Sequence, residues 1–173
     1  MKTIATLLLL IISTVSWAGE FGPWTFGMSQ EQVLAETAEG PYRAFSNGNL
    51  ETYNGDFFGE KRNFQFYFEH GSLRRIAIRT YEGPNLEQAT AAWQQTYEAL
   101  QARFGEMEAP YIVGTSLEEL SAHARSRAEL GESAQMAPIA QPNDAVVFGS
   151  LTSVVHEGVR YYAMTVNLDQ PQL

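Results

Sequence analysis

The sequence predicts an α+β domain in which an antiparallel sheet of about five strands packs against a long amphipathic helix, with two further short helices. Two segments carry this prediction. Residues 63–81 alternate apolar and polar side chains on both sides of a glycine-containing turn, which is typical of a β-hairpin with one buried face. Residues 86–104 place apolar side chains at steps of three or four, which is typical of a helix packed on a sheet. We expect these two segments to form the core.

The hairpin has an irregular spacing after its turn. Its apolar side chains are Phe64, Phe66, Phe68, Leu73, Ile76 and Ile78. Two solutions are open: a three-residue loop, or a bulge at Arg74-Arg75 that absorbs one residue. Both align Phe66 with Ile76 and send both side chains inward, because burial of one face determines the register.

The segments before the hairpin predict a short helix followed by one or two strands. Ser29 and Gln32 form the capping box of a helix that is expected to run to about Glu39. Residues 42–53 are expected to hold one strand or two short ones. The Asn-Gly-Asp sequence at residues 54–56 predicts a turn before the hairpin.

Two helices are predicted after the hairpin. Asn85 is placed to cap the long helix, and Trp93 lies in the middle of its apolar stripe. Ser116 begins a second capping box and a third helix that is expected to end near Leu130. Residues 133–144 contain two prolines, so they are expected to form a loop and the most mobile segment.

The end of the chain returns to β-structure. Residues 145–155 and 159–168 flank a His-Glu-Gly turn and predict a second hairpin. One face of its second strand is apolar, with Tyr162, Met164, Val166 and Leu168. Residues 169–173 are expected to fray.

The first eighteen residues have the features of a secretory signal. A positive charge at Lys2 precedes an apolar run over residues 4–12, and Ser16-Trp17-Ala18 resembles a cleavage site. We expect cleavage after Ala18, which leaves a single domain at residues 19–173 that is periplasmic or secreted. The apolar run is short for a bilayer span, and we expect no transmembrane span in the mature chain.

Composition narrows the function classes. The chain has no cysteine, which excludes disulfides, thiolate metal sites and a lipidated cysteine. The formal net charge is −9, and without Lys2 the mature chain carries 10 − 20 = −10. This acidity argues against nucleic acid as a partner, because phosphate backbones attract basic surfaces.

Two motifs suggest a distant kinship. Residues 26–33 (Phe-Gly-Met-Ser-Gln-Glu-Gln-Val) resemble the helix start of small outer-membrane assembly lipoproteins of the BamE/SmpA type. Residues 66–73 are similar to the strand-turn-strand that follows in those proteins, and proteins of the β-lactamase-inhibitor type share a similar repeat unit. Many uncharacterised exported bacterial proteins combine such a unit with a following helix that ends in Phe-Gly, as Phe104-Gly105 does here. The resemblance covers about residues 24–105 and implies binding to proteins or envelope components rather than catalysis. It carries over no functional residue.

No catalytic or metal-binding motif stands out. The three histidines, His70, His123 and His156, lack a metal-ligand spacing, and the chain has no Gly-x-Ser-x-Gly elbow or glycine-rich phosphate loop. We therefore expect no metal, cofactor or catalytic residue, and a non-enzymatic role is favoured.

The candidate binding residues surround the central hairpin. They are Lys61, Arg62, Tyr67, Arg74, Arg75 and Arg79. A cationic, partly aromatic surface on an acidic protein suggests docking of an acidic partner: an envelope protein, a lipid headgroup or a cell-wall polymer. A simpler explanation is protection of a sheet edge and cross-strand pairing with Glu60, Glu69 and Glu82. The alternative function is a small envelope hydrolase or inhibitor-type effector with a cleft near residues 133–144.

Overall fold

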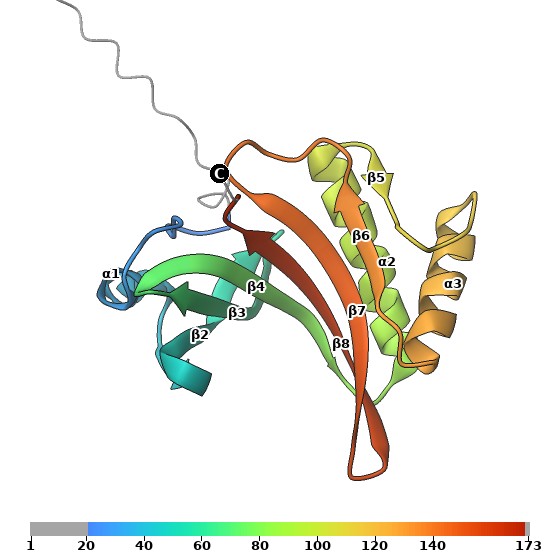
Figure 1. Cartoon of the computed structure of the whole chain (residues 1–173), viewed down its shortest axis with the longest axis horizontal. Coiled ribbons are helices and arrows are strands. Elements are labelled where there is room, and N and C mark those ends of the chain that lie inside the picture. Colours follow the sequence, from blue (N-terminus) through green and yellow to red (C-terminus); the bar gives the residue numbers. More distant parts are fainter. Residues whose placement is uncertain (1–20, 172–173) are drawn as a thin grey trace, which may run out of the picture.

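The computed structural model describes residues 21–171 and contains one antiparallel sheet of eight strands in this part of the chain. The order across the sheet is β1-β2-β3-β4-β8-β7-β6-β5 (Figure 1). The strands are β1 (Tyr42–Phe45), β2 (Asn49–Phe57), β3 (Glu60–Glu69), β4 (Ser72–Gly83), β5 (Met107–Glu108), β6 (Ala134–Pro138), β7 (Val146–His156) and β8 (Val159–Asp169). The predicted signal segment and its cleavage site lie outside the described residues.

Three α-helices accompany the sheet: α1 (Gln30–Ala35), α2 (Leu86–Phe104) and α3 (Leu117–Glu129). The side chains of Ser29, Asn85 and Ser116 accept hydrogen bonds from backbone N–H groups of the three first turns, as expected of N-caps. Helix α1 is shorter than predicted, because a separate 3-10 turn, η2 (Thr37–Glu39), follows it. None of the helices within residues 21–171 is long and apolar enough to cross a membrane.

The predicted architecture, a sheet of about five strands packed against one long helix, is wrong. The two hairpins join through β4 and β8 into a single wider sheet. Strands β5 and β6 are added at one edge, where Ala134 lies opposite Leu151 on β7. Strand β6 occupies part of the segment that was predicted to be a mobile loop. This strand is short and ends at Pro138, so its own sequence carries little β signal and its pairing with β7 defines it as a strand.

A second correction concerns residues 54–56. They lie inside β2 rather than in a turn, and the chain reverses at Phe58-Gly59 instead. A bulge interrupts the β2–β3 pairing between Thr52 and Gly55. A Cβ atom at Gly55 would lie 2.2 Å from Cδ2 of Phe64, so glycine is required here for close packing rather than for a turn.

The register of the central hairpin follows the bulge solution. Phe66 lies opposite Ile76, and a two-residue turn at His70-Gly71 places Phe68 opposite Leu73. The pairing shifts between Tyr67 and Phe68, which leaves Arg74 as the extra residue.

The core lies on one face of the sheet. Phe64, Phe66 and Trp93 are fully buried in one cluster that includes residues of all three helices. Helix α2 packs along β4, β7 and β8, and α3 packs against α2. The aromatic ring directly on the phenylalanines is Trp24 of the N-terminal segment, whose centroid is 5.4 Å from that of Phe64 and 4.7 Å from that of Phe66. The core face of the sheet is therefore covered at Phe64 and Phe66 by this segment and along β4, β8 and β7 by α2.

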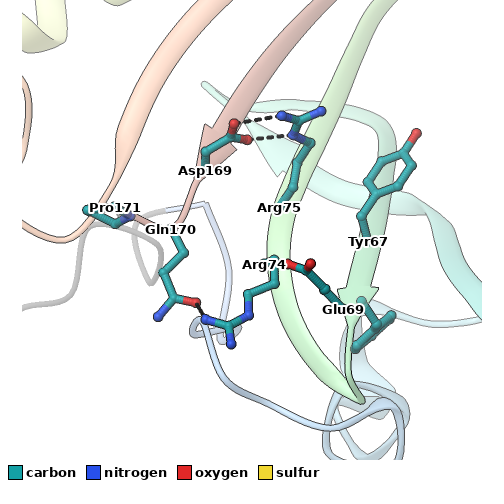
Figure 2. Close-up of a pocket in the computed structure, with 8 residues that line it drawn as sticks. Tyr67, Glu69, Arg74, Arg75, Asp169, Gln170 and Pro171 are labelled. Atoms are coloured by element: carbon teal, nitrogen blue, oxygen red, sulfur yellow. Dashed lines mark hydrogen bonds and ion pairs between the residues drawn. The ribbon is translucent and has the colours of Figure 1, made fainter. Parts of the chain in front are cut away.

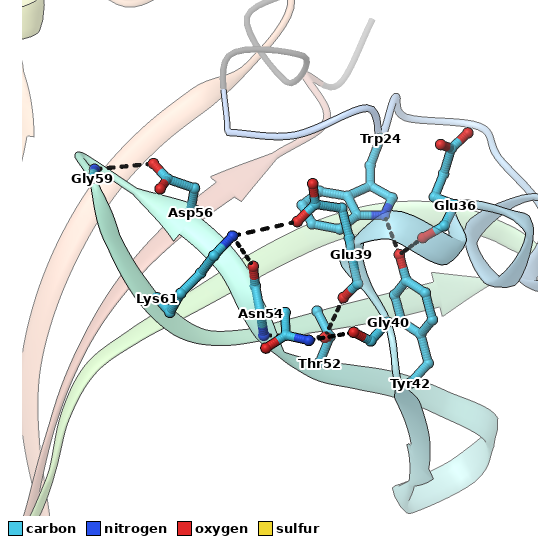
Figure 3. Close-up of polar contacts among 10 residues, drawn as sticks. All are labelled: Trp24, Glu36, Glu39, Gly40, Tyr42, Thr52, Asn54, Asp56, Gly59 and Lys61. Carbon is cyan, nitrogen blue, oxygen red and sulfur yellow. Dashed lines mark hydrogen bonds and ion pairs between the residues drawn. The ribbon is translucent and has the colours of Figure 1, made fainter.

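Polar contacts hold the N-terminal segment on the sheet (Figure 3). Trp24 Nε1 donates to the Tyr42 hydroxyl (3.1 Å), which donates to the carbonyl oxygen of Glu36 (2.9 Å). The Thr52 hydroxyl donates to the carbonyl oxygen of Glu39 (2.6 Å). Burial raises the pKa of the Tyr42 hydroxyl, so it keeps its proton and its role as a donor. The hydroxyls of Tyr42 and Thr52 are occupied with backbone carbonyls, which identifies the network as structural.

Candidate functional site

The site begins with a row of side chains on the face of the sheet opposite the core. Successive residues of a strand point to opposite faces, so the neighbours of the buried Phe66 and Ile76 point away from the helices. Tyr67 on β3 lies opposite Arg75 on β4, and Arg75 lies opposite Asp169 on β8. Three strands thus place an aromatic ring, a guanidinium and a carboxylate side by side.

A cleft of about 460 Å³ adjoins this row (Figure 2). It is lined by Tyr67, Phe68, Glu69, Arg74, Arg75, Asp169, Gln170 and Pro171. We call it the Tyr67–Asp169 cleft. Its walls come from the turn end of the β3–β4 hairpin and from the end of β8.

Arg75 and Asp169 form a bidentate ion pair in the cleft (Figure 2). Arg75 Nε donates to Oδ1 of Asp169 (2.5 Å) and Nη2 donates to Oδ2 (2.7 Å). The hydrogen bonds with Asp169 raise the pKa of Arg75, while its partial burial acts in the opposite direction. The guanidinium therefore stays charged and fixed in orientation. Asp169 was expected to fray, which is wrong because β8 extends through it.

Arg74 is positioned by the bulge. Its carbonyl oxygen accepts a hydrogen bond from the backbone N–H of Gln170 (2.9 Å), and its Nη1 donates to the Gln170 side chain. The extra residue lets Leu73 point into the core while Arg74 and Arg75 both reach the cleft.

Tyr67 is held in place by two neighbours. Its hydroxyl donates to Oε1 of Gln65 (2.9 Å) on the same strand. The ring of Phe45 on β1 meets it edge-on, with centroids 5.6 Å apart and an interplanar angle of 88°. The ring is half-buried and its orientation is set before any ligand arrives.

Arg79 lies on the same strand as Arg75 but outside the cleft. Its Nη1 lies 2.8 Å from Oε2 of Glu82, which is on the same strand rather than across from it, and its Nη2 donates weakly to Gln65 Oε1 (3.5 Å). Its charge is therefore balanced locally.

The structure separates the last two candidates from the others. Arg62 pairs with Glu60 of its own strand rather than across strands, and its Nη1 donates to the carbonyl oxygen of Thr80 (3.2 Å) beside α2. Lys61 Nζ lies 4.0 Å from Glu39 and donates to the carbonyl oxygen of Asn54 (Figure 3). Of the six predicted residues, only Tyr67, Arg74 and Arg75 meet in one cleft.

The segment proposed for the alternative function also has a cleft, of about 300 Å³. Its lining residues are Arg103, Phe104, Ala140, Gln141, Pro142 and Asn143. The Gln141 amide hydrogen-bonds to backbone groups of Pro138 and Val147, so it pins this loop to the sheet. The polar atoms of the Gln141 side chain therefore bind backbone groups of the protein rather than point toward a ligand.

The histidines lie apart from one another and from the cleft lining. His70 and His156 are exposed at hairpin turns, and His123 Nδ1 accepts a hydrogen bond from the backbone N–H of Val113 (2.6 Å). Within residues 21–171, no group of three or more His, Asp or Glu side chains is placed to hold a metal ion.

Sequence reasoning missed Asp169, Gln170 and Phe45 as neighbours of the hairpin. Asp169 is separated from Arg75 by 94 positions, so no local pattern links them. The matching lengths of β4 and β8 are the signal that could have suggested a contact, but their register becomes known only when the strands pair.

Comparisons with protein-family models, curated proteins and solved structures found no match to this chain. The resemblance to the BamE/SmpA-type unit therefore stays a prediction.

Proposed function

We propose that this chain is an exported, non-enzymatic binding or accessory protein of the cell envelope, and that its ligand binds in the Tyr67–Asp169 cleft. The observation that carries the proposal is the in-register row of Tyr67, Arg75 and Asp169 beside a cavity of about 460 Å³. Side chains on paired strands are more rigidly placed than side chains on loops, which lowers the entropy cost of binding.

The chemistry of the row suits binding better than catalysis. A general acid or base works best when its pKa lies near the ambient pH. The pKa of Arg75 is instead raised, so this group holds its proton and donates hydrogen bonds. Asp169 serves as its fixed counter-charge.

The charges favour a polar ligand over the acidic partner expected from the sequence. Arg74 and Arg75 line the cleft together with Glu69 and Asp169, so two positive charges are matched by two negative ones. Arg62 and Arg79 are likewise paired with carboxylates. An acidic molecule would therefore meet little net attraction on this surface.

Export is the first part of the proposal to test. Expression with the complete amino terminus in a bacterial host, followed by fractionation and intact-mass measurement, should recover a periplasmic or secreted chain that begins at Gly19. A chain that retains residues 1–18 and stays in the cytoplasm would contradict export.

Binding is tested with paired variants in the mature chain. Tyr67→Ala and Arg74→Ala should weaken retention of the envelope components that the wild-type protein recovers from detergent-free envelope fractions. Two controls match them: Tyr111→Ala removes a tyrosine that is 81% exposed, and Arg125→Ala removes an arginine of α3 whose side chain is 43% exposed. Equal recovery by all four variants and the wild type would refute a binding role for the cleft.

A further inference from the structure

We propose that the ligand of the Tyr67–Asp169 cleft is an uncharged, hydroxyl-rich molecule, namely a neutral oligosaccharide or a segment of a neutral polysaccharide. This inference rests on the proposed binding function of the cleft and specifies its ligand class. Three features carry it: the neutralised guanidinium, the fixed aromatic ring and the size of the cleft.

The guanidinium of Arg75 is already engaged by a carboxylate. Two of its N–H groups point at Asp169, at 2.5 and 2.7 Å, which is the fork geometry that an incoming carboxylate or phosphate would itself use. An anionic ligand would have to displace Asp169 or lie beside its negative charge. The first loses a bidentate ion pair, and the second adds a like-charge repulsion.

A hydroxyl group meets neither obstacle. Arg75 retains N–H groups that are not directed at Asp169, and the Asp169 oxygens retain lone pairs. A sugar hydroxyl both donates and accepts, so one hydroxyl can accept from Arg75 while it or its neighbour donates to Asp169. The oxygen of the Tyr67 hydroxyl, which donates to Gln65, is a further acceptor in the same row.

The Tyr67 ring offers an apolar surface beside these polar groups. A sugar ring has a C–H face that packs on aromatic surface, while its hydroxyls point sideways to hydrogen-bonding partners. The perpendicular Phe45 ring and the hydrogen bond to Gln65 hold the tyrosine, so the ring is oriented without the ligand. This arrangement lowers the ordering cost of a weakly interacting ligand.

The remaining cleft residues extend the same chemistry. Arg74 and Gln170 contribute a guanidinium and an amide that already contact each other, and Glu69 contributes a carboxylate. The cavity volume of about 460 Å³ falls in the range of small-molecule sites, about 300–1,000 Å³.

Nuclear magnetic resonance titration of the mature chain with matched tetrasaccharides tests the inference. The neutral probes are N-acetylchitotetraose and maltotetraose, and the acidic probe is tetragalacturonate. At least one neutral probe should shift the backbone amide signals of Tyr67, Arg75 and Asp169. Its affinity should change less than about two-fold between about 0.05 and 0.5 M salt, because no net charge is exchanged.

Asp169→Asn gives opposite results for the two ligand classes. This substitution should weaken the binding of a neutral saccharide, because one acceptor oxygen and the fixed orientation of Arg75 are lost. The same substitution should strengthen the binding of an anion, because Arg75 loses its counter-charge. Tyr67→Phe should retain most of the affinity for the neutral probe, and Tyr67→Ala should lose about ten-fold or more. Circular dichroism confirms the fold of each variant.

Preferential binding of tetragalacturonate by the wild type, or tighter binding of the neutral probe by Asp169→Asn, would overturn the saccharide inference. The saccharide inference would also be overturned if no neutral probe bound while recovery of envelope components still depended on Tyr67 and Arg74. In that case the proposed binding function of the cleft would stand. Loss of this dependence as well would remove the proposed function itself.

Discussion

Replacement of Gly55 by alanine tests the packing beneath the central hairpin. The new Cβ would lie 2.2 Å from Cδ2 of Phe64 and 2.5 Å from its Cγ, well inside van der Waals contact. Phe64 is fully buried under Trp24, so its ring has no free space to move into. Overpacking of this kind costs about 1–3 kcal/mol. The lower entropy of alanine in the unfolded chain returns about 0.5–1 kcal/mol, so we expect a net loss of up to about 2.5 kcal/mol.

Urea unfolding of the mature chain, followed by tryptophan fluorescence, measures this loss as a change in the free energy of unfolding. Phe64→Ala removes Cγ and the ring atoms that clash and serves as the second background. There, Gly55→Ala should cost less than about half of what it costs in the wild type, a coupling typical of residues in contact. An equal cost in both backgrounds, or a stabilised Gly55→Ala single variant, would refute the predicted clash.

Three further predictions concern other parts of the domain. Val147→Thr should lower the free energy of unfolding by about 1–3 kcal/mol, because Val147 is fully buried and the new hydroxyl would lack a partner; Val154→Thr, the same change at a position 63% exposed, should stay within about 0.5 kcal/mol in the same urea assay. Asn85→Ala should cost about 1 kcal/mol by removing the N-cap of α2, and Asn85→Ser should restore most of it in thermal unfolding. Hydrogen bonds from the backbone and hydroxyl of Thr115 lower the pKa of Glu119 below its usual value of 4.5, so the stabilising effect is present above that value and is lost as the pH falls through the folded-state pKa. Thr115→Val should therefore raise the pKa of Glu119 measured by a nuclear magnetic resonance pH titration, and an unchanged titration curve would contradict the assignment.

Local chemistry made the helices predictable. Helix α2 begins and ends at the expected residues because Asn85 caps its first turn and Gly105, with φ of 86°, follows its last. Caps and terminating glycines act within one turn of the chain. Helix α1 was predicted too long because its last turn changes to 3-10 geometry, which depends on how Glu39 contacts Thr52 across the sheet.

Strand pairing was harder to predict because it depends on distant partners. Alternation revealed the long strands of both hairpins, where several apolar residues share a face. Strand β5 has two residues and β6 has five, so neither contains enough of the pattern. Gly55 was misread for a related reason: glycine allows both a turn and a close approach, and only the position of Phe64 separates the two.

The sequence by itself determined the capped helices, the two hairpins and their buried faces, because these depend on side-chain period and on contacts within a few residues. It also placed Tyr67, Arg74 and Arg75 among six candidate binding residues of the central hairpin, and the structure brings only these three into one cleft. Only the tertiary structure decided that β4 and β8 pair, which places Asp169 against Arg75 and turns a basic patch into a neutral cleft. The physical reason is that electrostatic attraction depends on the distance between the charges in space. Arg75 and Asp169 are 94 positions apart in the sequence, and the distance between them is set only when β4 and β8 pair in register.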